Sequence, residues 1–234
     1  MTDWLTPVEW EALGLSAKVA IWSVGLSLPL AVATAYLLTR VDFPGRSVVN
    51  GLIHLPLVLP PVVTGYLLLI LFGTKGPIGG WLEDTFGIVL AFRWTGAVLA
   101  AALMGFPLMV RAIRLSLEGI DPRMESAART LGAGRAVVFL TISLPQLMPG
   151  IIAGAILSFA KGVGEFGATI TFVSNIPGET RTLSIAIYSF LQTPTGDAAA
   201  IRLTVIAVVL SMAALIASEL LARRASRRVK GMEP

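Results

Sequence analysis

The 234-residue chain contains no cysteine and only one histidine, His54. It therefore cannot form disulfides, thiolate nucleophiles, Cys-ligated zinc sites or iron–sulfur clusters, and a histidine metal site or a Ser-His-Asp triad is not expected. Charged residues make up 14% of the chain and the mean hydropathy is +0.81, whereas a soluble domain has about a quarter of its residues charged. The 23 glycines and 14 prolines are typical of transmembrane helices. The composition indicates an integral membrane protein.

A helix needs about 20 mostly apolar residues to cross a bilayer. Runs of this kind lie at about 19–39, 48–73, 95–110, 137–160 and 203–222. The run 95–110 is short and is expected to extend into its flanks. The apolar stretch 166–174 is too short to span, so we expect it to continue the fourth helix or to form a re-entrant piece. The predicted fold is an all-α membrane protein with about five transmembrane helices.

The positions of Lys and Arg predict the orientation of these spans. Segments 40–47, 111–136 and 223–234 hold 12 of the 18 basic residues, which makes them cytoplasmic by the positive-inside rule. We therefore predict an N-terminus outside and a C-terminus inside. The net charge of +4 follows from this topology, and no nucleic-acid partner is expected.

The two ends of the chain carry further signals. Residues 1–18 contain Asp3, Glu9 and Glu11 where a cleaved signal peptide would have positive charge. We therefore expect this segment to remain uncleaved and to lie outside the membrane or at its outer interface. Residues 223–234 form a basic tail that is expected to anchor at the anionic inner leaflet.

The loop 119–135 carries the signals of a short helix. Asp121 can cap it, Pro122 suits the first helical position, Glu125 has a box-like capping spacing, and Gly132 or Gly134 can end it.

The same loop has features of a docking element. Its small residues Ser126, Ala127 and Ala128 allow a partner to approach closely, and Met124 and Leu131 can insert into a partner's groove. From the residues alone, a simple surface connector is an equal alternative.

Three stretches of the chain resemble one family. Residues 127–133 (Ala-Ala-Arg-Thr-Leu-Gly-Ala), with Phe139, Ile142 and Leu144-Pro145 after them, resemble the EAA loop of bacterial ABC importer permeases. Residues 55–66 resemble the second-span signature of molybdate and sulfate permeases, and residues 164–169 with 175–188 closely resemble the molybdate type. The resemblance covers about 50–73 and 119–190. It departs at Ser126, which stands where the motif has glutamate, while Glu125 lies one position earlier.

The resemblance implies a type I ABC importer permease that moves molybdate by alternating access. The whole chain, 1–234, would be one permease domain in the bacterial inner membrane, working as a homodimer in contact with membrane lipid. Two cytoplasmic ATPase subunits would bind ATP and Mg²⁺, and a periplasmic or lipoprotein oxyanion-binding protein would deliver the substrate. The ATPase-coupling residues would be Glu125, Ser126, Ala127, Ala128, Arg129, Leu131 and Gly132.

The chain itself is not expected to be an enzyme or to hold a cofactor. It has no Gly-x-x-x-x-Gly-Lys-Ser/Thr motif, and residues 73–76 (Gly-Thr-Lys-Gly) lack the required spacing. The energy source must therefore be another polypeptide.

The second apolar run is rich in proline, and this points to the transport pathway. Pro56, Pro60 and Pro61 cannot donate backbone hydrogen bonds, so they kink or open the helix. The freed carbonyls must be covered by protein or line a water-filled cavity. We expect this helix at a subunit interface or along the pathway, with Thr64 and Tyr66 as hydroxyl donors; a purely structural kink is the alternative.

Glu165 is the second candidate site, because carboxylates at the membrane end of a span tend to be functional or paired. Lys161 lies four residues earlier on the same helical face, so an ion pair is predicted. A carboxylate would repel an anionic substrate, which favours a gate or interface role over a ligand role. Thr169 and Thr171 are the candidate pore hydroxyls.

Other readings stay open. An importer of sulfate, thiosulfate or tungstate would have the same architecture. A proton-coupled carrier or an intramembrane enzyme would need more ionisable groups within the spans than His54 and Glu165, and a structural scaffold would not explain the capped loop. The outer segments 74–94 and 174–202 are a candidate docking surface or ordinary solvated loops. Their charged residues are Lys75, Arg93, Glu179, Arg181 and Asp197.

Overall fold

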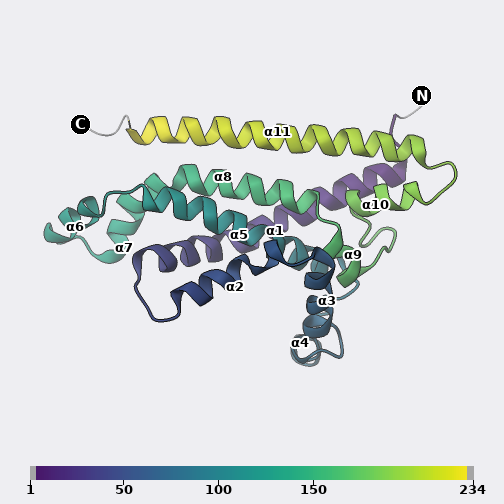
Figure 1. The fold of residues 1–234 in the computed structure, drawn as a ribbon, viewed down its shortest axis with the longest axis horizontal. Coiled ribbons are helices and arrows are strands. Elements are labelled where there is room, and N and C mark those ends of the chain that lie inside the picture. The colour runs from purple at the N-terminus through teal and green to yellow at the C-terminus, as the bar shows by residue number, and fades with distance from the viewer. Residues whose placement is uncertain (1–3, 231–234) are drawn as a thin grey trace.

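The computed structural model describes residues 4–230 and is built from helices (Figure 1). In chain order these are α1 (Pro7–Arg40), α2 (Arg46–Val58), α3 (Pro61–Phe72), α4 (Pro77–Phe86), α5 (Trp94–Glu118), α6 (Pro122–Thr130), α7 (Arg135–Val138), a π-helical turn (Phe139–Ser143), α8 (Leu144–Val163), α9 (Gly167–Val173), α10 (Leu183–Leu191) and α11 (Asp197–Lys230).

The expected number of membrane spans is confirmed. Within residues 4–230, four stretches are long and apolar enough to cross a membrane: α1, α5, the stretch 135–163 and α11. The bent pair α2–α3 makes a fifth if it counts as one span. The short third run does extend into its flanks, since α5 is 25 residues long.

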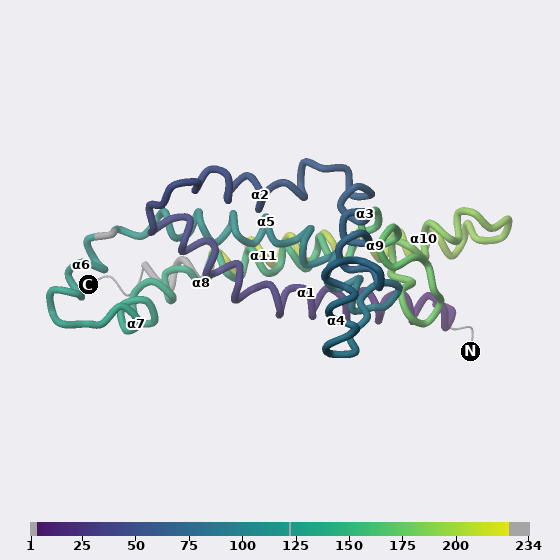
Figure 2. The backbone as a smooth tube through the Cα atoms, turned by 90° about the horizontal axis from the view of Figure 1, so that it is seen from below, coloured from purple at the N-terminus to yellow at the C-terminus, as the bar shows by residue number. Residues whose placement is uncertain are grey.

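The long helices lie side by side, and the two ends of the bundle differ. In Figure 1, α11 runs along α8, and α5 lies between α8 and α1. Figure 2 shows α6 and α7 at one end and α10 at the other. The start of α1 lies near α10, whereas the C-terminal end of α11 reaches the end that carries α6 (Figure 1). This is the arrangement that an odd number of crossings requires; which end faces the cytoplasm stays a prediction.

Small residues bring the central helices close together. Gly105 of α5 lies against α8 so tightly that an added Cβ would be 2.2 Å from the Ser158 hydroxyl oxygen, and one on Gly154 would be 3.1 Å from the Met109 Cα. Such small-residue contacts are how helices associate in lipid, where burial of apolar area gives little driving force. Larger apolar side chains, among them Ile113 and Leu147, fill the core toward the α6 end.

The first helix begins earlier than the apolar run predicted. Thr6 caps it, with its hydroxyl accepting from the Glu9 N–H at 3.4 Å while the Glu9 carboxylate accepts from the Thr6 N–H at 2.6 Å. Glu9 is fully buried and receives two hydrogen bonds from Arg202 of α11, at 3.0 and 3.2 Å. Because a partner distant in sequence neutralises Glu9, the helix continues through residues that look like a polar leader.

The second apolar run is broken, as the prolines predicted. α2 ends at Val58, α3 begins at Pro61, and their axes differ by 114°. The stretch 166–174 does not continue the fourth helix: α8 ends at Val163, residues 164–166 interrupt it, and α9 is a separate helix of seven residues. Whether α9 is re-entrant stays a prediction.

Candidate functional site

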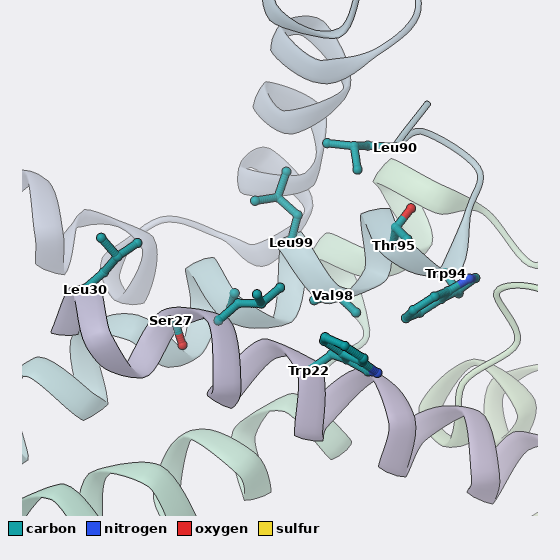
Figure 3. A pocket seen from close by; sticks show the side chains of 10 residues that line it. Trp22, Ser27, Leu30, Leu90, Trp94, Thr95, Val98 and Leu99 are labelled. Carbon is teal, nitrogen blue, oxygen red and sulfur yellow. The ribbon is translucent and has the colours of Figure 1, made fainter. Parts of the chain in front are cut away.

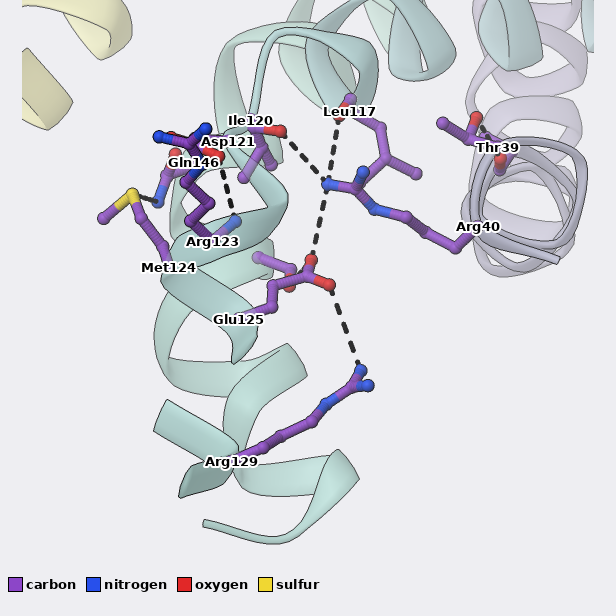
Figure 4. Close-up of polar contacts among 12 residues, drawn as sticks. Thr39, Arg40, Leu117, Ile120, Asp121, Arg123, Met124, Glu125, Arg129 and Gln146 are labelled. Atoms are coloured by element: carbon purple, nitrogen blue, oxygen red, sulfur yellow. Dashed lines mark hydrogen bonds and ion pairs between the residues drawn. The ribbon is translucent and has the colours of Figure 1, made fainter. Parts of the chain in front are cut away.

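The short helix α6 forms where the sequence predicts it, at the tip of the bundle. The Asp121 carboxylate accepts from the Arg123 N–H at 2.9 Å (Figure 4), and Pro122 occupies the first helical position. Gly132 follows the helix with a φ of +89°, a left-handed conformation that suits glycine, and so ends it. Asp121 and Gly132 therefore have the terminal roles expected of them.

The outer side of α6 is available to a partner. Leu131 is 89% exposed and Met124 is 43% exposed. Between them, Ser126 and Ala127 are exposed and Ala128 is partly buried. A partner that approaches this side would meet two apolar side chains flanking a stretch of small ones.

Glu125 points the other way, into the protein. It is buried, its Oε1 accepts from the Ser143 hydroxyl at 2.8 Å, and it lies 3.5 Å from the Arg40 Nη2. Arg129 adds a longer ion pair at 4.0 Å. The predicted capping role of Glu125 is wrong, because Asp121 caps the helix without it. The Glu125 carboxylate instead connects α6 to the end of α1 (Figure 4) and to the π-helical turn.

Arg40 and Ser143 were not among the residues predicted for the site. Arg40 ends α1 and also donates to the carbonyls of Leu117 and Ile120 at 3.4 Å each. Ser143 ends the π-helical turn that precedes α8. Through Glu125, α6 is thus tied to the end of α1 and to the start of α8.

The second group of candidates lies where α3 crosses α9. A Cβ added to Gly65 would be 2.5 Å from the Ala168 carbonyl oxygen, and one added to Gly167 would be 2.7 Å from the Pro61 Cβ. The structure therefore brings together two segments about 100 residues apart in sequence. Pro60 and Pro61 begin α3.

The hydroxyls at this crossing are not equivalent. Thr64 is buried, and its Oγ1 has no hydrogen-bond partner among the residues described. Thr169 is also buried, whereas the Thr171 hydroxyl donates to the Gly167 carbonyl at 2.8 Å. Tyr66 is 57% exposed, so it faces away from the crossing. Thr64 and Thr169 are thus the buried hydroxyls at this crossing without a hydrogen bond among the residues described, and the Thr64 Oγ1 is the one that is fully shielded from solvent.

Glu165 forms the predicted ion pair. Its Oε2 lies 2.6 Å from the Lys161 Nζ, and its Oε1 accepts from the Ala168 N–H at 3.1 Å. The carboxylate is buried and links the end of α8 to the first turn of α9. Its charge is matched by Lys161 within the chain, and a gate or interface role for Glu165 stays a prediction.

The chain matches a known protein family over most of its length. Residues 27–227 match the family described as binding-protein-dependent transport system inner membrane component. The chain belongs to this family. Across 224 residues, 96% of the chain and 98% of its relative, it is 58% identical to the molybdenum transport system permease protein ModB of Escherichia coli K12. It is 53% identical over 222 residues to the ModB of Haemophilus influenzae, covering 95% and 97% of the two chains.

A further relative and two solved structures extend the comparison. The sulfate transport system permease protein CysT of Escherichia coli K12 is 39% identical over 232 residues, 95% of this chain and 83% of that one. A bacterial alginate ABC transporter superposes with a TM-score of 0.73 at 17% identity, covering 94% of this chain and 80% of the other. An amino acid ABC transporter gives 0.63 at 21% identity, covering 96% and 99%. The fold is thus that of an ABC transporter permease, a multi-pass inner-membrane protein.

Several charged residues of segments 74–94 and 174–202, and Lys18 of α1, contact other residues of the chain. The Glu179 carboxylate accepts from the Trp94 N–H at 3.2 Å, and Arg181 donates to the Asn175 side chain at 2.9 Å. Lys18 lies 3.6 Å above the Trp94 ring. Lys75, Arg93 and Asp197 are exposed.

A groove of about 500 Å³ lies between α1 and α5 (Figure 3). Its wall is formed largely by apolar side chains, including Trp22, Leu30 and Trp94, and contains no charged residue. One of its two polar residues is Ser27, whose hydroxyl donates to the Ser23 carbonyl oxygen at 2.6 Å. An oxyanion would find few donors there, so this groove is no candidate for a substrate site.

Proposed function

We propose that this chain is the membrane-spanning subunit of an ATP-driven importer of molybdate. The observation that carries this proposal is the 58% identity over almost the full length of both chains to a ModB permease. Identity at that level, over all the helices, supports a shared substrate as well as a shared fold.

The chain would obtain its energy through α6. It has no nucleotide-binding motif, so two separate ATPase subunits would bind ATP and Mg²⁺, each receiving one α6. Leu131 and Met124 would enter a groove of the ATPase, and the small residues Ser126, Ala127 and Ala128 would allow close approach. Arg129 and Gly132 complete the proposed contact, while Glu125 would pass movement of α6 to α1 and α8.

A second copy of the chain would complete the pathway. Pro56, Pro60 and Pro61 leave three carbonyls, those of Leu52, Pro56 and Leu57, without the N–H donor that a regular helix supplies. In α2 only Pro56 is buried. Unpaired carbonyls are not tolerated against lipid, so we place a partner protomer, or a water-filled path between two protomers, on this side.

The opposite side of the bundle suits lipid. Only 6% of the apolar stretch of α11 that could cross the membrane is buried. Its exposed surface carries Val205, Val208, Met212 and Leu215. The positive-inside rule places its C-terminal end in the cytoplasm. The basic tail from Arg223 onward, of which residues 231–234 lie outside the part described, would meet the inner leaflet.

The crossing of α3 and α9 would form part of the gate. Thr64 offers a hydroxyl with no partner in the described chain, and Thr169 and Thr171 lie on the helix that it meets, with Tyr66 on the outer side of α3. Glu165 would hold α9 in place through Lys161 rather than bind the anion. In alternating access, ATP binding would move α6, and the two copies of this crossing would separate or close.

An oxyanion-binding protein would dock on the end opposite α6. Lys75, Arg93 and Asp197 are exposed there and supply both signs of charge. The three carboxylates that are buried among the described residues, Glu9, Glu125 and Glu165, are all paired. The part of the chain that the structure describes therefore has no series of free buried carboxylates of the kind that a proton-coupled carrier needs.

The experiment is uptake of radiolabelled molybdate by cells that lack their own high-affinity system. The chain is expressed with its neighbouring ATPase and binding protein, and an ATPase variant unable to hydrolyse ATP is the control. We expect ATP-dependent accumulation that resists excess sulfate. Accumulation that persists with the inactive ATPase would overturn the proposal.

Sulfate is the second candidate substrate, because the CysT relative is 39% identical over 95% of this chain. Uptake dominated by sulfate or thiosulfate in the same experiment would identify sulfate as the substrate class. Inhibition by tungstate at concentrations similar to those of molybdate would show that the importer accepts tungstate as well. In either case the coupling through α6 would be unchanged.

A further inference from the structure

A polar pocket of about 260 Å³ lies between α2 and α5, and none of its lining residues belongs to α6 or to the α3–α9 crossing. Asn50 and His54 of α2 and Arg111, Arg114 and Glu118 of α5 line it, with Leu115 at its rim. Glu118 is the last residue of α5, so Arg114 and Arg111 lie about one and two turns before the helix end. The pocket is therefore near the end of the bundle that carries α6 (Figure 1).

The two arginines leave positive charge in this pocket. Arg114 donates to the Asn50 side-chain oxygen at 2.6 Å and to Glu118 at 3.2 Å, which matches its charge. Its Nε–H is buried without a partner in the described part of the chain. Arg111 is exposed and forms no ion pair with any residue that the structure describes. One guanidinium charge and one buried donor are thus unused, and a buried donor without an acceptor is costly.

His54 adds a third polar side chain to the pocket. Its Nδ1 lies 2.9 Å from the Asn50 carbonyl oxygen, and because a carbonyl only accepts, the proton belongs on Nδ1. Nε2, on the other side of the ring, has no hydrogen-bond partner among the described residues. Asn50 therefore orients both neighbours, His54 through its backbone and Arg114 through its side chain.

We propose that this pocket binds one tetrahedral oxyanion group, either a free inorganic anion or the phosphate of an anionic phospholipid. Guanidinium groups match the oxygens of such a group in geometry as well as charge. The volume of about 260 Å³ suits a group of a few heavy atoms. Leu115, 63% exposed at the rim, gives an acyl chain a place to continue. This site goes beyond the proposed transport function and does not depend on which anion is moved.

The test uses the full chain, assembled with its ATPase partner, in lipid nanodiscs. In one arm, inorganic molybdate, sulfate and phosphate are titrated by calorimetry with phosphatidylcholine as the lipid. In the other arm, phosphatidylglycerol is added to the discs and retained lipid is counted by native mass spectrometry. The variant is Arg111→Gln, which removes a side chain without a described partner; the control is Arg135→Gln, an exposed arginine of α7 at the same end.

We expect one ligand per chain in at least one arm, weakened about tenfold by Arg111→Gln and unchanged by Arg135→Gln, the size expected for one charge-assisted hydrogen bond. Binding in the inorganic arm identifies a free-anion site, and binding only in the lipid arm identifies a headgroup site. No binding in either arm, or equal weakening by both variants, would overturn the proposal. If Arg111→Gln fails to assemble, His54→Gln provides the same comparison. Because binding is measured directly, failed molybdate uptake would not affect this result.

Discussion

Replacing Gly65 by alanine tests the close crossing of α3 and α9. The new Cβ would lie 2.5 Å from the Ala168 carbonyl oxygen, 2.9 Å from the Ala168 Cα and 2.8 Å from the Thr171 Cβ. Two of these atoms belong to the backbone of α9, so no side-chain rotation relieves the contact. The helices must separate by roughly 1 Å, and overpacking of this kind costs about 1–3 kcal/mol.

The matched control is Gly51→Ala in α2, where an added Cβ meets nothing within 4 Å. Alanine is favoured over glycine in a helix by about 0.5–1 kcal/mol. Gly51→Ala should therefore be neutral or stabilising, while Gly65→Ala should be destabilising by up to about 2.5 kcal/mol after the same gain is subtracted. The two glycine-to-alanine changes are predicted to shift the free energy of unfolding in opposite directions.

The assay is unfolding of the purified chain in mixed micelles by increasing mole fraction of SDS, followed by tryptophan fluorescence. Gly167→Ala, whose Cβ would be 2.7 Å from the Pro61 Cβ, should resemble Gly65→Ala because it opens the same crossing from the other side. Molybdate uptake measured in parallel should fall with both. Equal stability of the Gly65 and Gly51 variants would refute a tight α3–α9 contact.

Three further predictions concern α6 and the charge pairs. Ala128→Arg should abolish association with the ATPase and therefore uptake, since a long side chain on α6 prevents close approach; association retained in a pull-down would contradict the docking role. Glu125→Gln, which removes the charge from a buried network, should destabilise the chain by about 1–2 kcal/mol and reduce uptake while ATPase association persists; lost association at unchanged stability would instead make Glu125 a contact residue. Arg202→Met should lower the free energy of unfolding by about 2–4 kcal/mol in the SDS assay, because it leaves Glu9 buried and unpaired. Arg223→Met, which breaks an exposed pair, should lower it by about 0.5 kcal/mol or less. Similar losses in the two variants would contradict the importance of burial.

The spans could be predicted from sequence because hydropathy is a local property. The apolar run begins after Lys18, whereas α1 begins at Pro7. The helix includes both charges because Lys18 lies over the Trp94 ring and Glu9 is paired with Arg202, 193 residues away. A local signal for the true start was present: Thr6-Pro-Val-Glu9 has the spacing of a capping box with proline at the first helical position.

The candidate sites were predictable to different extents. The Lys161–Glu165 pair follows from helical spacing, and the caps of α6 follow from Asp121 and Gly132. The inward direction of Glu125 does not follow, because it depends on Arg40 from another helix and on a π-helical turn that no spacing rule marks. The α3–α9 crossing depends in the same way on the bend at residues 59–60, whose presence the prolines indicate but whose angle they do not.

The placement of the chain ends at opposite ends of the bundle limits how two copies can be joined. α11 alone is 34 residues long, about 50 Å at ~1.5 Å per residue. A tandem gene fusion would have to return the chain across that distance, and a flexible polar linker cannot cross the hydrocarbon layer. A single-chain dimer of this permease would therefore need an added membrane-spanning helix between its halves, whereas the homodimer proposed above would not need one.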